Sequence, residues 1–506
     1  MFKKVLVANR GEIAVRVIRS LSAMGIETVA VYSEKDRGAL HVRRADEAVC
    51  VGPAASAESY LRVDRILEAA RQTGAEAIHP GYGFLSENSD FARACTEAGI
   101  RFIGPSPEAI DAMGEKTRAR DLMKDAEVPL VPGTPKAIED PRVALKAAEE
   151  MGFPVLVKAS AGGGGKGMRR VDKASEFVDA FEGARREAIS AFGNGDVYVE
   201  KFVVEPRHVE IQILADGNGH TVHLFERDCS IQRRHQKVIE ETPCPVLSEE
   251  VRQQMGEVAI QAAKTVDYEG AGTVEFLLDA EENFYFLEMN TRLQVEHPIT
   301  EMITGIDLVE WQVRIAAGEA LTLAQEDIER RGASVECRIY AEDTENDFRP
   351  APGPVRRMIA PQGPGVRVDA GVYGGDEVAV DYDPMIAKLV TWGEDREQAL
   401  RRMRGAIDEY VIGGEVKSNL EFHREVLQHP DFVSGNYDTQ FVPQWRKARE
   451  GRPQESALVA ELAAVLTQHR RDEALEAKID TGGQGSRTSV NRWKMLGRWQ
   501  HLGGRR

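Results

Sequence analysis

Short apolar runs alternate with amphipathic helical patterns along the first 115 residues of this chain. The apolar run at residues 5–8 precedes a helical pattern from about residue 12 to 24, and another apolar run follows at residues 28–32. Later, residues 77–78 precede a helical pattern from about 90 to 98. Strands that alternate with helices in this way are typical of a parallel sheet. The pattern predicts an α/β domain with a Rossmann-like parallel sheet over residues 1–115.

Such a sheet often binds a dinucleotide, but here the glycines do not support that function. The dinucleotide fingerprint is G-x-G-x-x-G directly after the first strand. Residues 9–13 read Asn-Arg-Gly-Glu-Ile instead, and residues 81–84 (Gly-Tyr-Gly-Phe) lack the third glycine. The sequence therefore disfavours nicotinamide or flavin binding.

Consecutive glycines mark a second unit, which follows a proline-rich connector at residues 129–135. A short strand is predicted at residues 155–158, before the glycine-rich run 162–167. A phosphate-binding P-loop ends in Gly-Lys-Ser/Thr and opens a helix, whereas residues 168–171 resemble a strand. The pattern predicts a hairpin whose flexible flap, flanked by Lys158 and Lys166, lets bare amides approach phosphates. The alternative is an ordinary flexible loop.

Two apolar strands, at residues 273–278 and at 284–287 with its extended continuation from Glu288, are predicted to form a hairpin. A turn centred on residues 281–282 would place Ala280 opposite Asn283, and Glu275 opposite Glu288. Like charges directly opposite each other destabilise a sheet, and a hard cation such as Mg²⁺ with oxygen ligands removes the conflict. The pair therefore predicts a metal shared with nucleotide phosphates. The alternative is a solvated hairpin face.

The segment that leaves this hairpin carries polar side chains at every second position. If it stays extended, alternate side chains point to one face, and these are Glu288, Asn290, Arg292, Gln294 and Glu296. An arginine and a further glutamate beside the paired carboxylates indicate a site that holds something charged.

The rest of the chain is less distinctive. Further strands are predicted at residues 197–203 and 209–214. A charged run such as 230–241 is usually solvated surface, so by itself it indicates a site only weakly. Residues 331–445 read as a separate α+β unit, with a strand at 335–339, proline-rich turns at 350–364 and a helix at about 396–410. An amphipathic helix is predicted at about 455–471.

Composition limits the class of protein. A chain of 506 residues suggests three or four domains, and a net charge of −17 argues against nucleic acid as a partner. Residues 446–506 differ, with 13 Lys+Arg against 7 Asp+Glu. Five scattered cysteines fit a reduced cytoplasmic setting, and no apolar run is long enough to span a membrane.

Taken together, these motifs resemble those of the biotin carboxylases, ATP-grasp enzymes that carboxylate biotin in acetyl-CoA, propionyl-CoA and pyruvate carboxylases. The resemblance runs from about residue 6 to 445, through residues 8–14, 80–88 and 288–298. It implies an N-terminal biotin carboxylase domain (1–115), an ATP-grasp domain (116–330) with a flap subdomain at about 130–203, and a C-terminal α+β biotin carboxylase domain (331–446). Residues 447–506 would be a basic tail.

The resemblance also implies roles for individual residues. The side chains expected to bind ATP are Lys116, Lys158, Gly163, Gly164, Gly165, Glu200, Lys201, Val203, His208, Gln232, His235, Glu275 and Glu288. Glu275 and Glu288, with Asn290, would hold Mg²⁺ or Mn²⁺. Bicarbonate would bind Arg292, Gln294 and the Val295 amide, and Glu296 would take its proton. Lys237 would hold carboxyphosphate, and Arg338 would bind the biotin ureido oxygen. The expected catalytic residues are Glu296, Arg338, Lys237 and Arg292.

The biotin-accepting motif of the family, Ala/Val-Met-Lys-Met, does not occur in this sequence. We therefore expect biotin to arrive on a separate carrier protein, and the chain itself not to be biotinylated. The expected partners are this carrier protein, a separate carboxyltransferase and a second copy of the chain, with no nucleic acid and no membrane. The basic tail would either dock on a partner or pack on its own acidic body.

The sequence thus predicts a cytoplasmic ATP-dependent ligase, the biotin carboxylase subunit of an acetyl- or propionyl-CoA carboxylase. The alternative within the family is the biotin-carboxylating member of a two-subunit pyruvate or 2-oxo acid carboxylase. Another ATP-grasp ligase is disfavoured because the bicarbonate segment and Arg338 occur together. An inactive nucleotide-sensing scaffold is disfavoured because Lys237, Glu288, Arg292 and Glu296 are all present.

Overall fold

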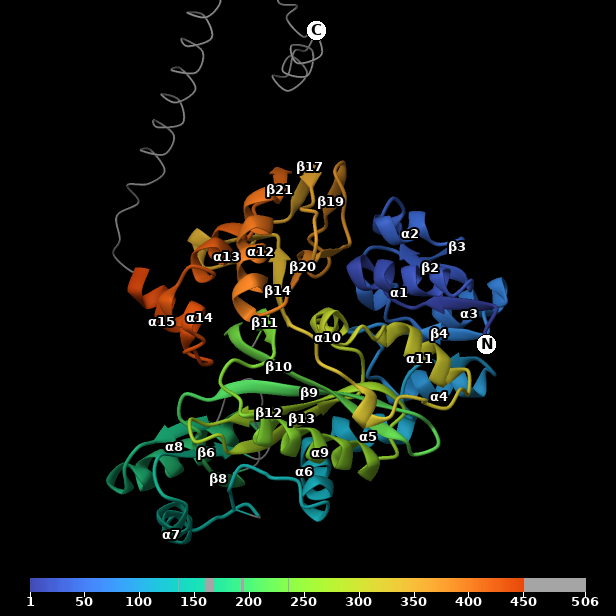
Figure 1. Cartoon of the computed structure of the whole chain (residues 1–506). Helices are drawn as coiled ribbons and strands as arrows, with labels where there is room; N and C mark the ends of the chain where they lie inside the picture. The colour runs from blue at the N-terminus through green and yellow to red at the C-terminus, as the bar shows by residue number, and fades with distance from the viewer. Residues whose placement is uncertain (135, 160–167, 193–194, 235, 450–506) are drawn as a thin grey trace, which may run out of the picture. The chain divides into compact units, whose positions relative to one another are not determined.

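The computed structural model of the chain describes residues 1–134, 136–159, 168–192, 195–234 and 236–449. Residues 1–443 form one compact unit, whose elements are labelled in Figure 1. Residues 444–506 form a second unit, of which 444–449, the end of helix α15 (Phe441–Arg449), are described. The tail helix predicted at 455–471 and the docking hypothesis therefore lie outside the described residues. Among those described, no helix combines the length and apolar character that crossing a bilayer requires.

The N-terminal sheet is parallel, as the sequence predicts, with the strand order β3-β2-β1-β4-β5. Both faces of β1 are covered: Val5 and Val7 pack in one core with Val17 of α1, and Leu6 packs in another with Phe91 of α4. A strand buried on both faces is apolar at every position, which explains the run at residues 5–8. The elements are β1 (Lys4–Val7), α1 (Gly11–Ala23), β2 (Glu27–Ser33), α2 (Leu40–Arg44), β3 (Glu47–Gly52), α3 (Val63–Thr73), β4 (Ala77–His79), α4 (Ser89–Glu97), β5 (Arg101–Phe102) and α5 (Pro107–Gly114).

An antiparallel eight-stranded sheet occupies the centre of this unit, in the order β13-β12-β9-β10-β11-β14-β20-β18. Its strands are β9 (Arg207–Ala215), β10 (Thr221–Arg233), β11 (Gln236–Thr242), β12 (Gly270–Leu278), β13 (Phe284–Asn290), β14 (Ala333–Tyr340), β18 (Val366–Ala370) and β20 (Met385–Gly393). The helices α9 (Glu249–Thr265), α10 (His297–Thr304) and α11 (Leu308–Ala316) belong to the same stretch of chain. Strands from both sides of the predicted boundary at 330/331 thus share one sheet.

The hairpin of β12 and β13 pairs Glu275 with Glu288, which confirms that prediction. The predicted turn is wrong, however. The Asp279 amide donates to the Asn283 carbonyl at 3.0 Å, and Leu278 pairs with Phe284, so the turn register differs by one residue. A β-bulge at Leu287 then inserts one extra residue between the Phe276–Phe286 and Glu275–Glu288 pairs. Because a one-residue slip moves side chains to the other face, this bulge restores the pairing of the two glutamates.

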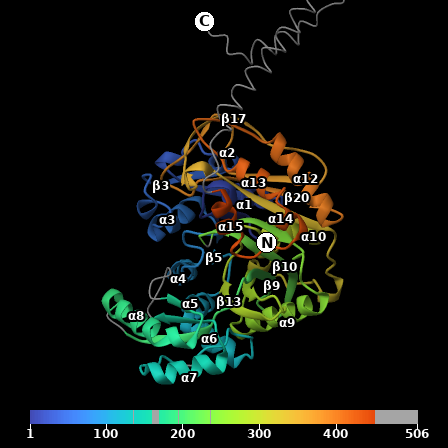
Figure 2. The same cartoon turned by 90° about the vertical axis from the view of Figure 1, so that its left-hand side faces the viewer.

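A smaller sheet, β7-β6-β8, forms the flap subdomain with a core of its own, in which Val155 and Val157 pack against Phe177 and Phe181. β6 and β7 are antiparallel, with Lys158 opposite Met168, which confirms the predicted hairpin. The glycines that join them lie outside the described residues. Its elements are α7 (Pro141–Met151), β6 (Val155–Ala159), β7 (Met168–Val171), α8 (Ala174–Phe192) and β8 (Val197–Lys201); Figure 2 shows α7 and α8 near each other. Helix α6 (Lys116–Asp125) precedes them, and its Ala119 and Met123 pack in the core of the central sheet.

The C-terminal part adds a three-stranded sheet, β19-β17-β21, and helices that pack against the central sheet. Residues 350–364 are not only turns, as the prolines suggested, because β17 runs through them from Gly353 to Ile359. The remaining elements are β15 (Glu342–Asp343), β16 (Arg349–Pro350), β17 (Gly353–Ile359), β19 (Asp376–Val378), α12 (Arg396–Glu409), β21 (Val411–Gly414), α13 (Leu420–Val426) and α14 (Pro430–Ser434).

A fully buried arginine, Arg227 on β10, ties the central sheet to α10. Its Nε donates to Glu210 at 2.6 Å. Its Nη1 donates to Gln212 at 2.7 Å and to Thr300 of α10 at 2.8 Å, and its Nη2 to Thr273 of β12 at 3.1 Å. One side chain therefore satisfies polar groups on three elements.

Replacing Arg227 by methionine should destabilise the protein by about 3–5 kcal/mol, because it leaves the Glu210 carboxylate buried without its arginine. Chemical denaturation measures the change. The matched control is Arg356→Met, whose ion pair with Glu415 is exposed on both sides and should contribute little that denaturation detects. Equal effects of the two substitutions would contradict this account.

Candidate active site

Two adjoining cavities, of about 1340 Å³ and 630 Å³, meet at the β13 end of the central sheet. Glu87, Glu288 and Asn290 line both of them. The larger cavity is also lined by Tyr82 from the N-terminal domain and Arg338 from β14. Segments far apart in the sequence therefore enclose one space.

A row of charged residues crosses four neighbouring strands beside these cavities. Arg227 of β10 pairs with Glu210 of β9, Glu210 pairs with Glu275 of β12, and Glu275 pairs with Glu288 of β13. Glu210 is fully buried and Glu275 is 4% exposed, whereas Glu288 is exposed and faces the cavities. Three carboxylates in one row need nearby cations, because buried like charges raise each other's free energy.

Glu275 accepts hydrogen bonds from several side chains that the sequence also singles out. Its Oε1 accepts from Lys237 at 2.8 Å, from Asn290 at 2.9 Å and from Gln294 at 3.1 Å. Its Oε2 lies 2.9 Å from Nε2 of His208. Burial by itself raises the pKa of Glu275, but Lys237 and His208 outweigh it and hold that pKa well below the ordinary value.

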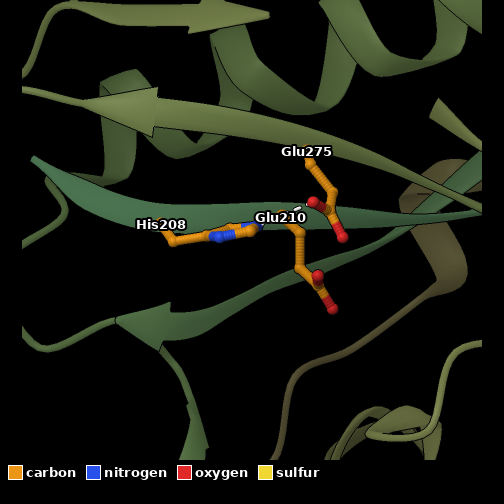
Figure 3. Close-up of side chains that lie close together, drawn as sticks. All are labelled: His208, Glu210 and Glu275. Carbon is orange, nitrogen blue, oxygen red and sulfur yellow. Dashed lines mark ion pairs between the residues drawn. The ribbon is translucent and has the colours of Figure 1, made fainter. Parts of the chain in front are cut away.

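Figure 3 shows His208, Glu210 and Glu275 close together, with a dashed line for the His208–Glu275 ion pair. Their ligand atoms lie within 4.8 Å of one another, a spacing that could hold a metal ion. In this structure, however, Glu210 is engaged by Arg227 and Lys237. The pKa of His208 is raised because Glu275 outweighs the effect of burial. The trio is therefore part of a network of ion pairs.

Lys237 of β11 is the centre of that network. Its Nζ donates to Glu275 at 2.8 Å, to Glu296 at 2.7 Å and to Glu210. Burial disfavours the charged ammonium, but the three carboxylates raise the pKa of Lys237 well above its ordinary value. The lysine is therefore a fixed positive charge in the lining of the larger cavity.

Glu296 is fully buried between two cations. Its Oε1 accepts from Lys237, and its Oε2 accepts from Nη2 of Arg338 at 2.9 Å. Burial raises the pKa of Glu296, but Lys237, Arg338 and Arg227 together lower it well below the ordinary value. The carboxylate is thus ionised and able to accept a proton.

Arg292 donates hydrogen bonds to polar side chains near the end of β13. Its Nε donates to Glu87 at 2.9 Å, its Nη1 to Gln294 at 3.0 Å and its Nη2 to Asn290 at 3.1 Å. The expectation of one extended segment is wrong beyond Asn290, where β13 ends. The chain bends there, and Glu296 occupies the N-cap position of α10. The side chains converge through this bend and not through strand alternation.

The smaller cavity collects the side chains predicted to bind the nucleotide. Lys158, Glu200, Lys201 and Val203 all line it. Glu200 forms ion pairs with Lys158 and with Arg120, whose Nη1 lies 2.7 Å from Oε1. The Lys201 ammonium donates to the Gly152 carbonyl at 2.9 Å. Gln232 and His208 line the larger cavity instead.

Some predicted residues are not placed. Lys116 begins helix α6, but its side chain lies outside the described part of the chain, as do Gly163, Gly164, Gly165 and His235 in full.

The sequence analysis missed several side chains that lie in or beside the network. These are Glu87, Arg120, Glu210, Arg227, Glu240, Glu336 and Lys388. Lys388 is fully buried and donates to the Val295 carbonyl at 2.8 Å. Glu210 alternates with His208 on one strand, which is the signal that could have found it. Glu87 lies within the motif at residues 80–88, but its contact with Arg292 spans 205 positions.

Three family profiles match consecutive parts of the chain. They are the biotin carboxylase N-terminal domain over residues 1–110, the ATP-binding domain of the carbamoyl-phosphate synthase L chain over 115–324, and the biotin carboxylase C-terminal domain over 336–444. The three matches occur along the chain in the same order as the N-terminal parallel sheet, the central sheet and the C-terminal three-stranded sheet.

Individual proteins give the same result. Biotin carboxylase 1 of Bacillus subtilis is 53% identical over 443 residues, which are 87% of this chain and 98% of that protein. The alpha subunit of the mitochondrial methylcrotonoyl-CoA carboxylase of Mus musculus is 50% identical over 498 residues, 97% of this chain and 69% of that protein.

Among solved structures, the biotin carboxylase domain dimer of the Hydrogenobacter thermophilus 2-oxoglutarate carboxylase, in complex with MgADP, ADP and bicarbonate, has a TM-score of 0.80 and 48% identity. The match covers 90% of this chain and all of that one. With this likeness over nearly the full length of the Bacillus subtilis protein and of the solved domain, the chain belongs to the biotin carboxylase family of ATP-grasp ligases.

Proposed function

We propose that this chain uses ATP and bicarbonate to carboxylate biotin on a separate carrier protein. The observation that carries the proposal is the buried Glu296 carboxylate, held between Lys237 and Arg338 beside the cavity that Arg292 and Gln294 line. An anion-binding guanidinium and a fixed ammonium therefore line one space, and a proton acceptor lies directly behind Lys237 and Arg338. This set is what the activation of bicarbonate by phosphoryl transfer needs.

The two cavities correspond to two substrates in this proposal. ATP lies in the smaller one, with Lys158, Glu200, Lys201 and Val203, and its phosphates extend toward Glu288. Bicarbonate lies in the larger one, on Arg292, Gln294 and the Val295 amide. A planar guanidinium matches a planar oxyanion. The shared lining residue Asn290 is where the γ-phosphate and bicarbonate meet.

The donor set fits a divalent cation. Glu275, Glu288 and Asn290 offer side-chain oxygens from adjacent strands, and hard cations such as Mg²⁺ or Mn²⁺ prefer oxygen ligands. When bound, the ion neutralises charge on the phosphate oxygens. Glu275 is already ionised in this structure, because Lys237 and His208 hold its pKa down.

Glu296 accepts the bicarbonate proton while a bicarbonate oxygen attacks the γ-phosphorus and ADP leaves. A carboxylate with a strongly lowered pKa is a weak base. Bound bicarbonate makes Glu296 a stronger base, because the anion competes with Glu296 for Lys237. Partial loss of that ion pair raises the pKa of Glu296 toward a useful range. Lys237 then holds the carboxyphosphate product.

Arg338 serves the second half of the reaction. Carboxyphosphate collapses to carbon dioxide and phosphate, and the phosphate removes the proton from the biotin ureido nitrogen, which attacks carbon dioxide. Charge develops on the ureido oxygen in this step, and a fixed guanidinium stabilises it. Arg338 lines the larger cavity from β14, whereas the nucleotide residues Lys158 and Glu200 line the smaller one.

For the final acceptor we propose an acyl-CoA, acetyl- or propionyl-CoA, carboxylated by a separate carboxyltransferase in a cytoplasmic complex. Support comes from the methylcrotonoyl-CoA carboxylase relative, which matches 97% of this chain. The five cysteines are free thiols, as a reducing compartment favours. The likeness to a 2-oxoglutarate carboxylase domain supports the alternative, a two-subunit pyruvate or 2-oxo acid carboxylase. That domain is a dimer, and we expect a homodimer here.

Replacing Glu296 by glutamine should lower biotin carboxylation by about 10²–10⁴-fold, because a general base is lost. Arg338→Ala should also lose carboxylation, and both variants should still bind ATP. The assay is phosphate release in the presence of bicarbonate, Mg²⁺ and free biotin. Glu301→Gln is the control, a buried change on the same helix but away from both cavities. Normal turnover in Glu296→Gln would refute its role as base.

Replacing Glu288 by glutamine should raise the Mg²⁺ concentration needed for half-maximal nucleotide binding about 10-fold, because one charged oxygen ligand is lost. Titrating Mg²⁺ against a fluorescent ATP analogue measures this. Glu281→Gln, an exposed glutamate in the turn of the same hairpin, is the control. An unchanged Mg²⁺ requirement would exclude Glu288 as a ligand.

The acceptor can be identified by recovering the chain from its own cells with its bound partners. We expect a small biotinylated carrier and an acyl-CoA carboxyltransferase, with carboxylation of acetyl- or propionyl-CoA by the recovered complex. A carboxyltransferase that accepts pyruvate or another 2-oxo acid would favour the alternative. Biotin found on the chain itself would contradict the separate carrier.

A further inference from the structure

Arg338 is held from two sides by fully buried glutamates. Its Nη2 donates to Glu296 at 2.9 Å, and its Nε donates to Glu240 of β11 at 2.5 Å. Glu296 has a role as proton acceptor in the proposed function. Glu240 lines neither cavity, and the proposed function assigns it no role. What Glu240 does for Arg338 therefore needs an explanation of its own.

Glu240 lies directly opposite a second buried glutamate, Glu336, in the pairing of β11 with β14. Both are 0% exposed. Among the described residues, Oε2 of Glu240 and both carboxyl oxygens of Glu336 have no hydrogen-bond partner. Two adjacent carboxylates in a dry interior cannot both be ionised at modest cost, so one of them holds a proton.

The surrounding charges decide which glutamate that is. The titratable groups that surround the pair are Arg338 and Cys337 on β14, Lys237 on β11, Glu296 before α10, Lys388 on β20 and Cys229 on β10. Glu240 has a direct ion pair with Arg338, whereas Glu336 has none in the described structure. Burial raises the pKa of Glu240 to about 7, and that of Glu336 well above its ordinary value. Glu240 is therefore the ionised member, and Glu336 the neutral acid.

A role for Glu240 follows from the proposed function, on which it rests. When Glu296 takes the bicarbonate proton, it loses the charge that holds Nη2 of Arg338. The biotin step follows, and Arg338 must then stay in position with one anchor fewer. We propose that Glu240 is a positioning residue for biotin carboxylation: its carboxylate holds Arg338 while Glu296 is protonated, and the neutral Glu336 allows that carboxylate to stay ionised.

The test compares the full chain with Glu240→Gln across pH, at saturating ATP, Mg²⁺ and bicarbonate. At about pH 8 the variant should lose about 10²-fold in kcat/KM for free biotin, because Arg338 is misplaced, with the KM for ATP changed by less than about twofold. The ratio of wild type to variant should fall toward about 1 as pH drops through about 7, because Glu240 is then protonated in the wild type too. This ratio cancels the pH dependence of bicarbonate and of Glu296, which both proteins share.

Two further variants make the comparison specific. Glu336→Gln replaces a neutral acid by a neutral amide and should keep kcat/KM for biotin within about threefold. Glu226→Gln removes a different buried ion pair, with Arg252, on β10. It should lower stability and leave the biotin kinetics unchanged, which separates a general loss of stability from misplacement of Arg338.

Several results would overturn the inference: a ratio that does not change with pH, a Glu240→Gln variant with normal biotin kinetics at about pH 8, or a Glu336→Gln variant as impaired as Glu240→Gln. If Glu240→Gln does not fold, Glu336→Gln decides the matter, since retained biotin activity supports the inference and lost activity refutes it. Absence of bicarbonate-dependent ATP hydrolysis in the wild type would instead refute the proposed function, and the inference with it.

Discussion

The ammonium of Lys237 is the interaction on which the charged centre of this protein depends. It contacts Glu210, Glu275 and Glu296, which come from β9, from β12 and from the turn before α10. A carboxylate in a dry interior is costly unless a cation and hydrogen bonds compensate it. One lysine serves all three, so the strand that carries it must lie at a fixed distance from the other elements. The β10–β11 hairpin therefore both belongs to the sheet and positions the cation that stabilises these three carboxylates.

The continuous central sheet makes that arrangement possible. Arg227, Glu210, Glu275 and Glu288 lie in one row across four strands, and Arg338 enters from β14 in the same sheet. A sheet holds the spacing of such rows within narrow limits, because strand separation is fixed by backbone hydrogen bonds. Loops could not place several ion pairs at bonding distance with the same constancy. The residues of the smaller cavity that we propose to bind the nucleotide, by contrast, come largely from the small flap subdomain, which has a core of its own.

Much of this site could be predicted from the sequence where the contacts are local. Glu275 and Glu288 lie 13 residues apart, so hairpin pairing alone brings them together. The predicted turn was wrong by one residue, but the bulge at Leu287 offsets that difference and leaves the two glutamates paired. Contacts between residues far apart in the sequence could not be predicted from it. Glu210 meets Glu275 across 65 residues and Glu87 meets Arg292 across 205. Periodicity reports which face a side chain occupies, but not which distant strand lies beside it.

The same limit explains the bend after β13. Alternation predicted that Glu288 and Glu296 share a face of an extended strand, whereas the helix start at His297 places Glu296 in the interior. Nothing in the local pattern separates a polar strand from a polar turn that caps a helix. Asn290 and Gln294 contact Glu275 of β12, and Glu296 contacts Lys237 and Arg338, so the residues converge through tertiary contacts.

The buried glutamates divide into two groups, and this division assigns their roles. Of the three glutamates that contact Lys237, Glu275 and Glu296 have lowered pKa values, whereas burial and the neighbouring Glu296 raise the pKa of Glu210. Burial also raises the pKa values of Glu240, Glu336 and Glu12. Acid and base assignments follow where environments drive such values apart. The ionised carboxylates of Glu275 and Glu296 are those suited to ligands and protons. Glu336 lies beside the Glu240–Arg338 ion pair, where a neutral acid can be buried without a cation of its own. One protein interior thus keeps charge where the chemistry needs it and removes charge where the fold could not support it.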